Sequence, residues 1–300
     1  MRAWISSRAR IALELTTSPL GRRVGLVAGL ALFAAIAAQL AVQIHRGDLS
    51  NVSIRPWALV ASIGVACAAD LALAASWRSA LTFAGHGTHA AEAGGILLVA
   101  QIAKYVPGGV LQIASRVGVG ARRGVPARAS GTALVAEWGG LTVAGLATSA
   151  LLVMPWPIWI VLVLVAFVLA SVPRARRIAP LRRLVAWHLV VIVLLGVSAD
   201  LLFHAGGFSA GPASHVVGAY ALAWVAGFLV VFAPGGLGVR EAVFVALLAG
   251  TAGKSAALSV AVASRVVTVV ADLLMGGAGA ALLWRRAPST LLHRPADGDR

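Results

Sequence analysis

Hydrophobic residues in this chain occur in long runs rather than at the spacing of a surface helix or a half-buried strand. A helix needs about 20 consecutive apolar residues to cross the hydrocarbon core of a bilayer. Runs of this kind, bounded by charges, prolines or glycines, predict about six spans. They lie at 24–43, 57–77, 129–153, 157–172, 184–204 and 256–284. The pattern predicts an all-α polytopic integral membrane protein.

Two further apolar stretches, 92–120 and 216–250, are interrupted near the middle by Pro-Gly-Gly. Proline removes a backbone donor, so a continuous helix through either tripeptide would leave unsatisfied polar groups in lipid. Each stretch is therefore predicted to form a helical hairpin whose two arms meet at the break.

The composition agrees with a membrane location. The chain is 60% hydrophobic and 12% charged, against about 45–50% and about 25% in soluble domains. Its formal net charge of +15 is explained better by arginines in loops than by nucleic-acid binding. The single cysteine, Cys67, excludes an intramolecular disulfide and a cysteine-based metal cluster.

The arginines also predict an orientation. They gather before residue 24, in the 173–183 loop and after residue 284, whereas the 154–156 and 205–215 connections have none. Both termini are therefore predicted to be cytoplasmic. The chain divides into a basic N-terminus (1–22), a single transmembrane domain (23–285) and a disordered tail (286–300). Tryptophans at predicted span ends form an aromatic belt: Trp57, Trp77, Trp156, Trp159, Trp187 and Trp284.

The order span, span, hairpin, span occurs twice, with every direction reversed the second time. The predicted halves cover about 20–154 and about 156–285. An inverted repeat of this kind places a substrate site between the halves near the bilayer midplane. Beyond the shared tripeptide the halves have little identity, and chance is the competing explanation because Gly and Pro are frequent in membrane helices.

Charged side chains at membrane depth cost about 2.5–3.5 kcal/mol, so each is a candidate functional residue. Lys104 and Arg116 flank the first break and Arg240 follows the second. Arginine binds phosphate bidentately, and glycines at a helix break let backbone N–H groups approach it. These features predict a site for an anionic head group. The competing explanation is that the cations snorkel to the interface or neutralise buried acids such as Glu137, Glu241 and Asp272.

Glu137 and Arg265 lie inside the last predicted spans of the two halves. They are predicted to take part in coupling or in a buried ion pair, with Arg265 or Arg116 as the partner of Glu137. Proton coupling through Glu137 or Glu241 remains an alternative to a static salt bridge. Asp70 and Asp200 fall near the ends of spans 57–77 and 184–204. They are either symmetry mates in the two halves or, in the interpretation that we favour, interfacial polar residues.

No histidine spacing predicts a metal centre, and no Walker A, GxSxG or dinucleotide-binding fingerprint is present. We therefore expect no metal and no cofactor, and ATP-driven transport would need another protein.

The segments KYVPGGVLQIASR (104–116) and APGGLGVREAVFVALL (233–248) resemble the two signature segments of the lysylphosphatidylglycerol synthase transmembrane family. This flippase-like module occurs alone or fused to a soluble aminoacyl transferase. The span order extends the resemblance over about 20–285, and the absence of the transferase domain implies a stand-alone member. Gly109 departs from the larger or basic residue often found in relatives, which leaves the head group open. The motif positions implied to bind the head group are Lys104, Pro107, Gly108, Gln112, Arg116, Pro234, Gly235, Gly236, Gly238, Arg240 and Glu241.

The resemblance implies a non-enzymatic translocase in the bacterial inner membrane. Its substrate would be a membrane lipid with an anionic or modified head group, such as an aminoacyl-phospholipid or a polyprenyl-phosphate-linked sugar. A separate lipid-modifying synthase or glycosyltransferase is the expected partner. Two other functions remain open: a membrane enzyme that modifies a lipid-linked substrate with Glu137 or Glu241 as general base, and a small-solute secondary transporter.

Overall fold

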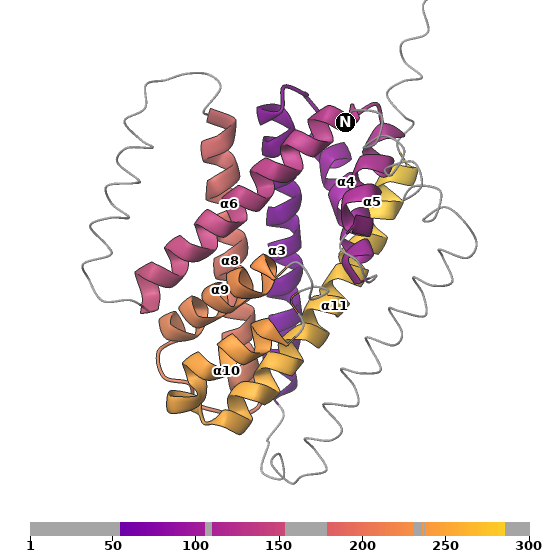
Figure 1. The fold of residues 1–300 in the computed structure, drawn as a ribbon. Coiled ribbons are helices and arrows are strands. Elements are labelled where there is room, and N and C mark those ends of the chain that lie inside the picture. The colour runs from indigo at the N-terminus through magenta and orange to yellow at the C-terminus, as the bar shows by residue number, and fades with distance from the viewer. Residues whose placement is uncertain (1–54, 106–109, 154–178, 231–235, 237, 286–300) are drawn as a thin grey trace, which may run out of the picture.

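The computed structural model describes residues 55–105, 110–153, 179–230, 236 and 238–285, and every element in these ranges is helical (Figure 1). The helices are α3 (Pro56–Phe83), α4 (Ala90–Gln101), the 3₁₀ turn η1 (Ile102–Tyr105), α5 (Val110–Ala121), α6 (Ala127–Val153), α8 (Ala179–Ala205), α9 (Ala213–Leu229), α10 (Val239–Ala252) and α11 (Lys254–Trp284).

Four of these helices, α3, α6, α8 and α11, are long and apolar enough to cross a membrane, and α9 is a shorter apolar helix. They coincide with the predicted spans 57–77, 129–153, 184–204 and 256–284, which confirms a helical membrane architecture. The predicted spans 24–43 and 157–172, the N-terminal segment and the tail lie outside the described residues.

Both predicted breaks interrupt the helices. In the first stretch α4 ends at Gln101, η1 continues to Tyr105, and α5 begins at Val110. In the second, α9 ends at Leu229 and α10 begins at Val239. Residues 106–109 and 231–235, which include most of both tripeptides, lie outside the described residues.

The centre of the molecule is the antiparallel pair α3 and α8 (Figure 1). At one end the backbone N–H of Arg55 donates to the carbonyl of Ala205 at 2.8 Å. Farther along, the hydroxyl of Ser62 donates to the carbonyl of Ser198 at 2.9 Å, and the hydroxyl of Ser198 donates to the carbonyl of Ser62 at 3.0 Å. Such small residues let membrane helices approach closely while their hydroxyl groups stay satisfied.

The other helices pack around this pair. Helix α11 packs on α4 and α3, and α6 packs on α9 and α8. Glycines form the closest contacts in both outer pairs. A Cβ on Gly279 would lie 2.7 Å from the Cβ of Leu98, and a Cβ on Gly145 would lie 2.4 Å from a methyl group of Val225. The α4–α11 and α6–α9 interfaces therefore both depend on glycine.

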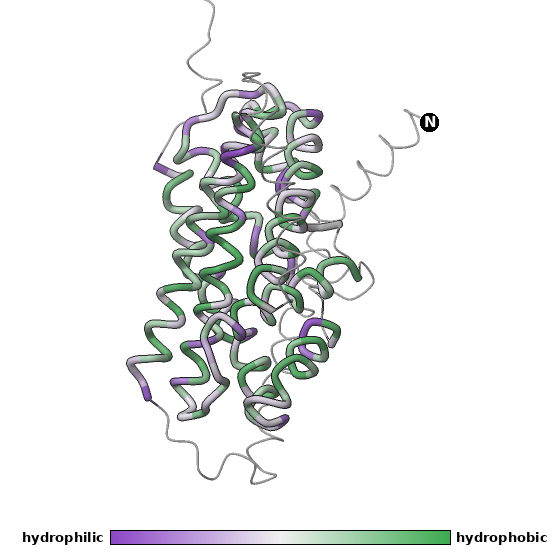
Figure 2. The backbone as a smooth tube through the Cα atoms, turned by 90° about the vertical axis from the view of Figure 1, so that its left-hand side faces the viewer, coloured by the Kyte–Doolittle hydropathy of each residue, from purple (hydrophilic) through white to green (hydrophobic). Residues whose placement is uncertain are grey.

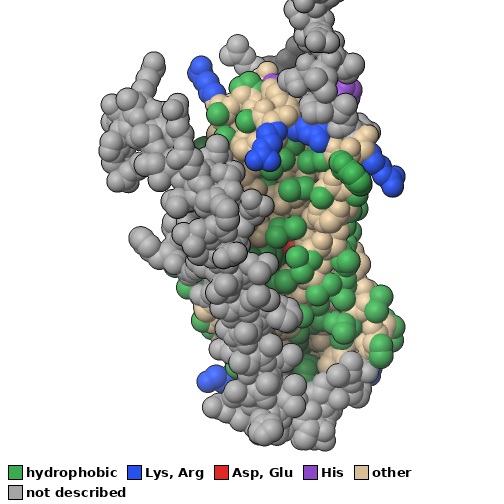
Figure 3. Space-filling model, turned by 90° about the vertical axis from the view of Figure 1, so that its right-hand side faces the viewer, with side chains coloured by type: hydrophobic (Ala, Val, Ile, Leu, Met, Phe, Trp, Pro, Cys, Tyr) green, Lys and Arg blue, Asp and Glu red, His purple; other side chains and the backbone are tan. Residues whose placement is uncertain are grey.

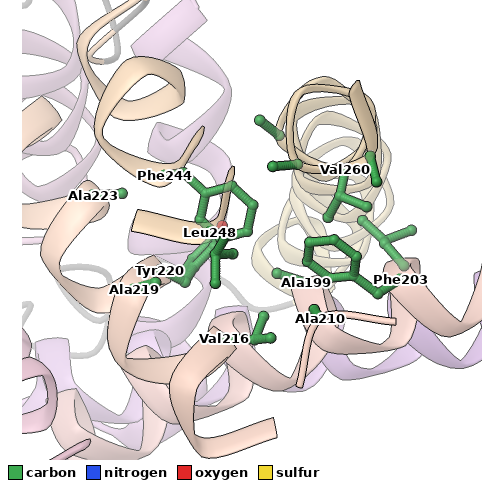
Figure 4. Close-up of a cluster of buried hydrophobic side chains, with 14 of the residues drawn as sticks. Ala199, Phe203, Ala210, Val216, Ala219, Tyr220, Ala223, Phe244, Leu248 and Val260 are labelled. Atoms are coloured by element: carbon green, nitrogen blue, oxygen red, sulfur yellow. The ribbon is translucent and has the colours of Figure 1, made fainter. Parts of the chain in front are cut away.

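An aromatic cluster fixes the lower part of the molecule in Figure 1. Phe203 of α8 stacks on Phe244 of α10 at 6.3 Å, and Tyr220 of α9 meets Phe244 edge-on at 5.9 Å. Figure 4 shows these rings packed with Leu248 of α10 and Val260 of α11 in one hydrophobic cluster. This cluster joins α9 and α10 to α8 and α11.

Large apolar side chains also cover much of the outside. Val60, Val135 and Leu274 are 67%, 70% and 57% exposed. Hydrophobic residues dominate the helices (Figure 2), and on the face in Figure 3 an apolar band separates lysines and arginines near the two ends. Such an exterior suits lipid contact.

One tryptophan departs from the predicted aromatic belt. Trp284 and Trp57 are 91% and 62% exposed, whereas Trp77 is 1% exposed and belongs to the core. The prediction for Trp77 was wrong because α3 does not end there but continues to Phe83. Trp156 and Trp159 lie outside the described residues.

Candidate functional site

Helix α11 connects the two interrupted segments. Its residues Arg265 and Asp272 are seven positions apart, which places them on one face, about two turns or 10 Å along the axis. Asp272 contacts η1 of the first segment, and Arg265 contacts α10 of the second. Both interruptions therefore converge on one face of α11, and this face, with the residues that it contacts, is the candidate site.

At the first interruption, Asp272 accepts hydrogen bonds from two consecutive residues of η1. The ammonium nitrogen of Lys104 lies 2.9 Å and 2.7 Å from the two carboxylate oxygens of Asp272. The hydroxyl of Tyr105 donates to the second oxygen. Asp272 is fully buried, while the Lys104 side chain is 25% exposed. The 3₁₀ turn that ends α4 is thus tied to α11.

A second buried carboxylate lies beside this ion pair. Asp70 of α3 is 7% exposed, and its Oδ2 atom is buried without a hydrogen-bond partner. It interacts electrostatically with Asp272 and Lys104. The interpretation of Asp70 as an interfacial residue was therefore wrong. Because α3 extends to Phe83, Asp70 lies in the middle of the helix and faces the bundle.

At the second interruption, Arg240 is 8% exposed, and its guanidinium lies 4.4 Å from the ring centre of Tyr220. Its Nη2 atom is buried and has no hydrogen-bond partner. The chain before α10 packs directly on α9, because a Cβ on Gly236 would lie 2.7 Å from the carbonyl oxygen of Gly227. Gly236 also has φ +70°, a conformation that favours glycine. This contact holds the start of α10 against α9.

Glu241 is occupied by structural contacts. One carboxylate oxygen accepts the backbone N–H of Gly238 at 2.7 Å, which closes the first turn of α10. The other accepts the Nε–H of Arg265 at 2.5 Å. Glu241 therefore caps α10 and neutralises Arg265.

A narrow hollow lies beside Arg240. Tyr220, Arg240, Glu241, Phe244, Ala261 and Ser264 line it. Counting the space open to the surface, its volume is about 170 Å³, but it is nowhere wide enough to admit a water molecule. In this conformation the hollow has no room for a ligand.

A separate polar cluster surrounds Arg116 of α5. One of its terminal nitrogens lies 2.6 Å from each carboxylate oxygen of Glu137 on α6, and the other donates to the side-chain oxygen of Gln101 at 3.2 Å. Gln112 donates to the same oxygen at 3.1 Å. The guanidinium lies 5.1 Å from the ring centre of Trp77. Of the two partners predicted for Glu137, the structure gives Arg116 and not Arg265.

The predicted site residues thus divide into two groups. Lys104, Arg240, Glu241 and Arg265 lie around the face of α11, with Gly236 and Gly238 at the start of α10. Gln112, Arg116 and Glu137 form the separate cluster. Pro107, Gly108, Pro234 and Gly235 lie outside the described residues.

Two aromatic residues of the site, Tyr105 and Tyr220, were not among the predicted site residues. Tyr105 could have been found from its position beside Lys104 and immediately before the first break. Nothing in the sequence distinguishes Tyr220, which meets Arg240 only through the packing of α9 on α10. Within the described ranges, no group of three His, Cys, Asp or Glu residues could hold a metal ion.

No protein-family model, curated protein or solved structure matches this chain. Its function is therefore argued from its own residues.

Proposed function

We propose that this protein translocates a lipid with an anionic or modified head group between the two leaflets of a membrane. The observation that carries the proposal is Arg240, a buried cation without a hydrogen-bond partner on its Nη2 atom, beside a narrow hollow at an interrupted membrane segment. A phosphate group offers the oxygens that a guanidinium binds most strongly.

The charges of the site favour Arg240 over the other cations as the ligand. Lys104 is paired with Asp272, Arg265 with Glu241, and Arg116 with Glu137. Taking a charge out of water costs several kcal/mol unless a partner compensates it. An arriving phosphate would compensate Arg240 without breaking an existing pair.

The packing of the helices supports an inverted repeat. If α3, α4, α5 and α6 correspond to α8, α9, α10 and α11, the principal contacts occur twice. Helix α4 packs on α11 as α9 packs on α6, and α3 packs on α11 as α8 packs on α6. The antiparallel central pair gives the two sets opposite directions. Repeats of this kind bind substrate between their halves and expose it alternately on each side.

The proposed cycle follows from these features. The head group enters between the halves, its phosphate binds Arg240, and rocking of the halves opens the hollow toward the other leaflet while the acyl chains stay in lipid. The resemblance of the two Pro-Gly-Gly segments to the flippase-like family supports a lipid of the aminoacyl-phospholipid or polyprenyl-phosphate-sugar class. A bacterial inner membrane, cytoplasmic termini and a separate synthase or glycosyltransferase belong to the same proposal.

The test is a leaflet-accessibility assay in proteoliposomes that contain a labelled aminoacyl-phosphatidylglycerol or a labelled polyprenyl-phosphate sugar. We expect one lipid to change leaflet chemically unaltered. Arg240→Ala should slow this about 10- to 150-fold, the loss expected for a charged hydrogen bond. Arg128→Ala, which removes an exposed arginine at the start of α6, is the matched control and should keep the parent rate.

Stability measurements separate binding from a structural role of Arg240. Removing a buried charge without a charged partner should leave the unfolding free energy unchanged or raised. If the stacking on Tyr220 were its main function, Arg240→Ala would instead cost up to about 2 kcal/mol. A covalently altered lipid product would favour a membrane enzyme, and solute uptake independent of the lipid would favour a secondary transporter. Either result would overturn the proposal.

A further inference from the structure

We infer that Asp70, together with Asp272 and Lys104, forms a proton-binding site that controls the attachment of η1 to α11. The site joins three elements, α3, α11 and the turn at the first interruption. It is distinct from the Arg240 hollow. Only its last step, the coupling of the proton to lipid movement, rests on the proposed function.

The geometry places two carboxylates and one ammonium group in a buried volume. Ala66 and Cys67 of α3 pack in the same hydrophobic cluster as Val267 and Ala271 of α11, which brings the adjoining Asp70 and Asp272 to one interface. Lys104 compensates Asp272 directly, at 2.7 Å. The Oδ2 atom of Asp70 has no hydrogen-bond partner, although the residue is more than nine-tenths buried.

The charge balance of this cluster depends on one proton. With both carboxylates ionised and Lys104 charged, the cluster carries one uncompensated negative charge. An uncompensated buried charge costs several kcal/mol, so Asp70 is most stable in this closed arrangement as the neutral carboxylic acid. Binding is a simple exchange, in which the carboxylate of Asp70 takes up one proton from water and releases it again.

The other ionisable groups on the elements packed against α3 already have partners or lie elsewhere. Glu137 of α6 is held by Arg116, and on α8 His188 contacts Ser76 while Asp200 lies 3.5 Å from His204. Glu92 is in the first turn of α4, at the opposite end of that helix from η1. Asp70 is therefore left to interact with Asp272, Lys104 and the hydroxyl of Tyr105, with the thiol of Cys67 one turn away.

Loss of the proton would change the attachment of η1. Once ionised, Asp70 competes with Asp272 for Lys104 and repels Asp272. Both effects weaken the contacts that fix Lys104 and Tyr105 to α11. Because η1 immediately precedes the first break, protonation of Asp70 determines whether η1 stays packed against α11.

The proton is measured directly by infrared difference spectroscopy of the purified protein without substrate. The protein is acidified from about pH 8 to about pH 5, a range above the usual pKa values of exposed carboxyl groups. We expect the carbonyl stretch of a protonated carboxylic acid in the parent protein and its loss in Asp70→Asn. The matched control, Asp200→Asn, should keep this band. A band unchanged in Asp70→Asn would overturn the inference.

A second variant keeps the inference testable if Asp70→Asn does not fold. Lys104→Gln removes the cation that favours the ionised form, so in a titration extended to about pH 10 the same band should appear at a higher pH than in the parent protein. A band at the parent pH would show that Lys104 does not act on this site and would contradict the inference.

The coupling step is tested in the proteoliposome assay with a pH gradient. The gradient should accelerate translocation by the parent protein and should not accelerate it in Asp70→Asn. A roughly 10- to 150-fold slower translocation in Arg240→Ala with the infrared band intact would separate the two sites. A sodium gradient that replaces the pH gradient, or translocation indifferent to both, would overturn proton coupling while leaving the Arg240 proposal standing.

Discussion

The Arg116–Glu137 pair allows the energetic role of a buried charge in this fold to be measured. Both side chains are 2% exposed, and one nitrogen of Arg116 lies 2.6 Å from each oxygen of Glu137. Glu137→Gln would leave the guanidinium buried with only neutral oxygens, those of Gln101 and of the new amide, and the face of Trp77 as compensation. Breaking a buried pair in this way typically costs about 3–5 kcal/mol. We expect a loss of that size in the unfolding free energy.

The assay is equilibrium unfolding of the purified protein in mixed detergent micelles, followed by helix content. A double-mutant cycle adds Glu137→Leu, Arg116→Met and the combined Arg116→Met, Glu137→Leu variant. Replacing both charges with apolar groups is often neutral or stabilising. The double variant should therefore be much more stable than Glu137→Gln, although each single change removes the same ion pair.

A more exposed pair provides the control. His204 and Asp200 lie 3.5 Å apart on α8, with side chains 57% and 15% exposed. Because His204 is open to solvent, Asp200→Asn should cost less than about 1 kcal/mol. If Glu137→Gln cost no more than this control, the Arg116 cluster would be solvated and the reasoning from burial would be refuted.

Three further changes test the packing. Gly145→Ala should destabilise the protein by about 1–3 kcal/mol because the new Cβ overlaps a side chain of α9. Gly139→Ala in the same helix meets open space and should stabilise the protein by up to about 1 kcal/mol. Thermal unfolding distinguishes the two variants. Gly236→Ala meets backbone at 2.7 Å and has φ +70°, so it should lower both stability and lipid movement by displacing the start of α10. Gly250→Ala, which meets open space in α10, should lower neither. Ser62→Ala should lower the unfolding free energy by about 1–3 kcal/mol in the same assay. The variant removes one hydrogen bond of the Ser198 hydroxyl on α8.

The long helices could be predicted from the sequence because their signal is local. An apolar run of sufficient length is enough to predict a span, and the predicted 256–284 differs from α11 only at its first two residues. The prediction was weakest where a helix continued past the end of its apolar run. Residues 78–83 contain Arg78, yet α3 extends through them and ends at Phe83, just before Gly85 with φ +82°.

The sequence predicts the pairing of charges only in part, because the pairing depends on which helix faces meet. Its alternatives for Glu137 were Arg265 and Arg116, and α6 itself carries one basic residue, Arg128, nine positions before Glu137. The partner that the structure gives, Arg116, lies on α5, and the contact requires that α5 pack against α6 beside Trp77. Likewise, only the packing of α3 on α11 brings Asp70 to Asp272.

Among the buried charged residues of the described segments, one of each sign has no ion-pair partner. The cation is Arg240 and the carboxyl group is Asp70, whereas Arg116, Glu137 and Asp272 are paired. The two unpaired groups are not independent, because Arg240 also interacts electrostatically with Tyr105 and Asp272, the residues that hold η1. An anion that binds Arg240 would add negative charge near Asp272 and so make a proton on Asp70 more favourable. Binding of the head group and uptake of the proton should therefore promote each other, through Coulomb interactions across one face of α11.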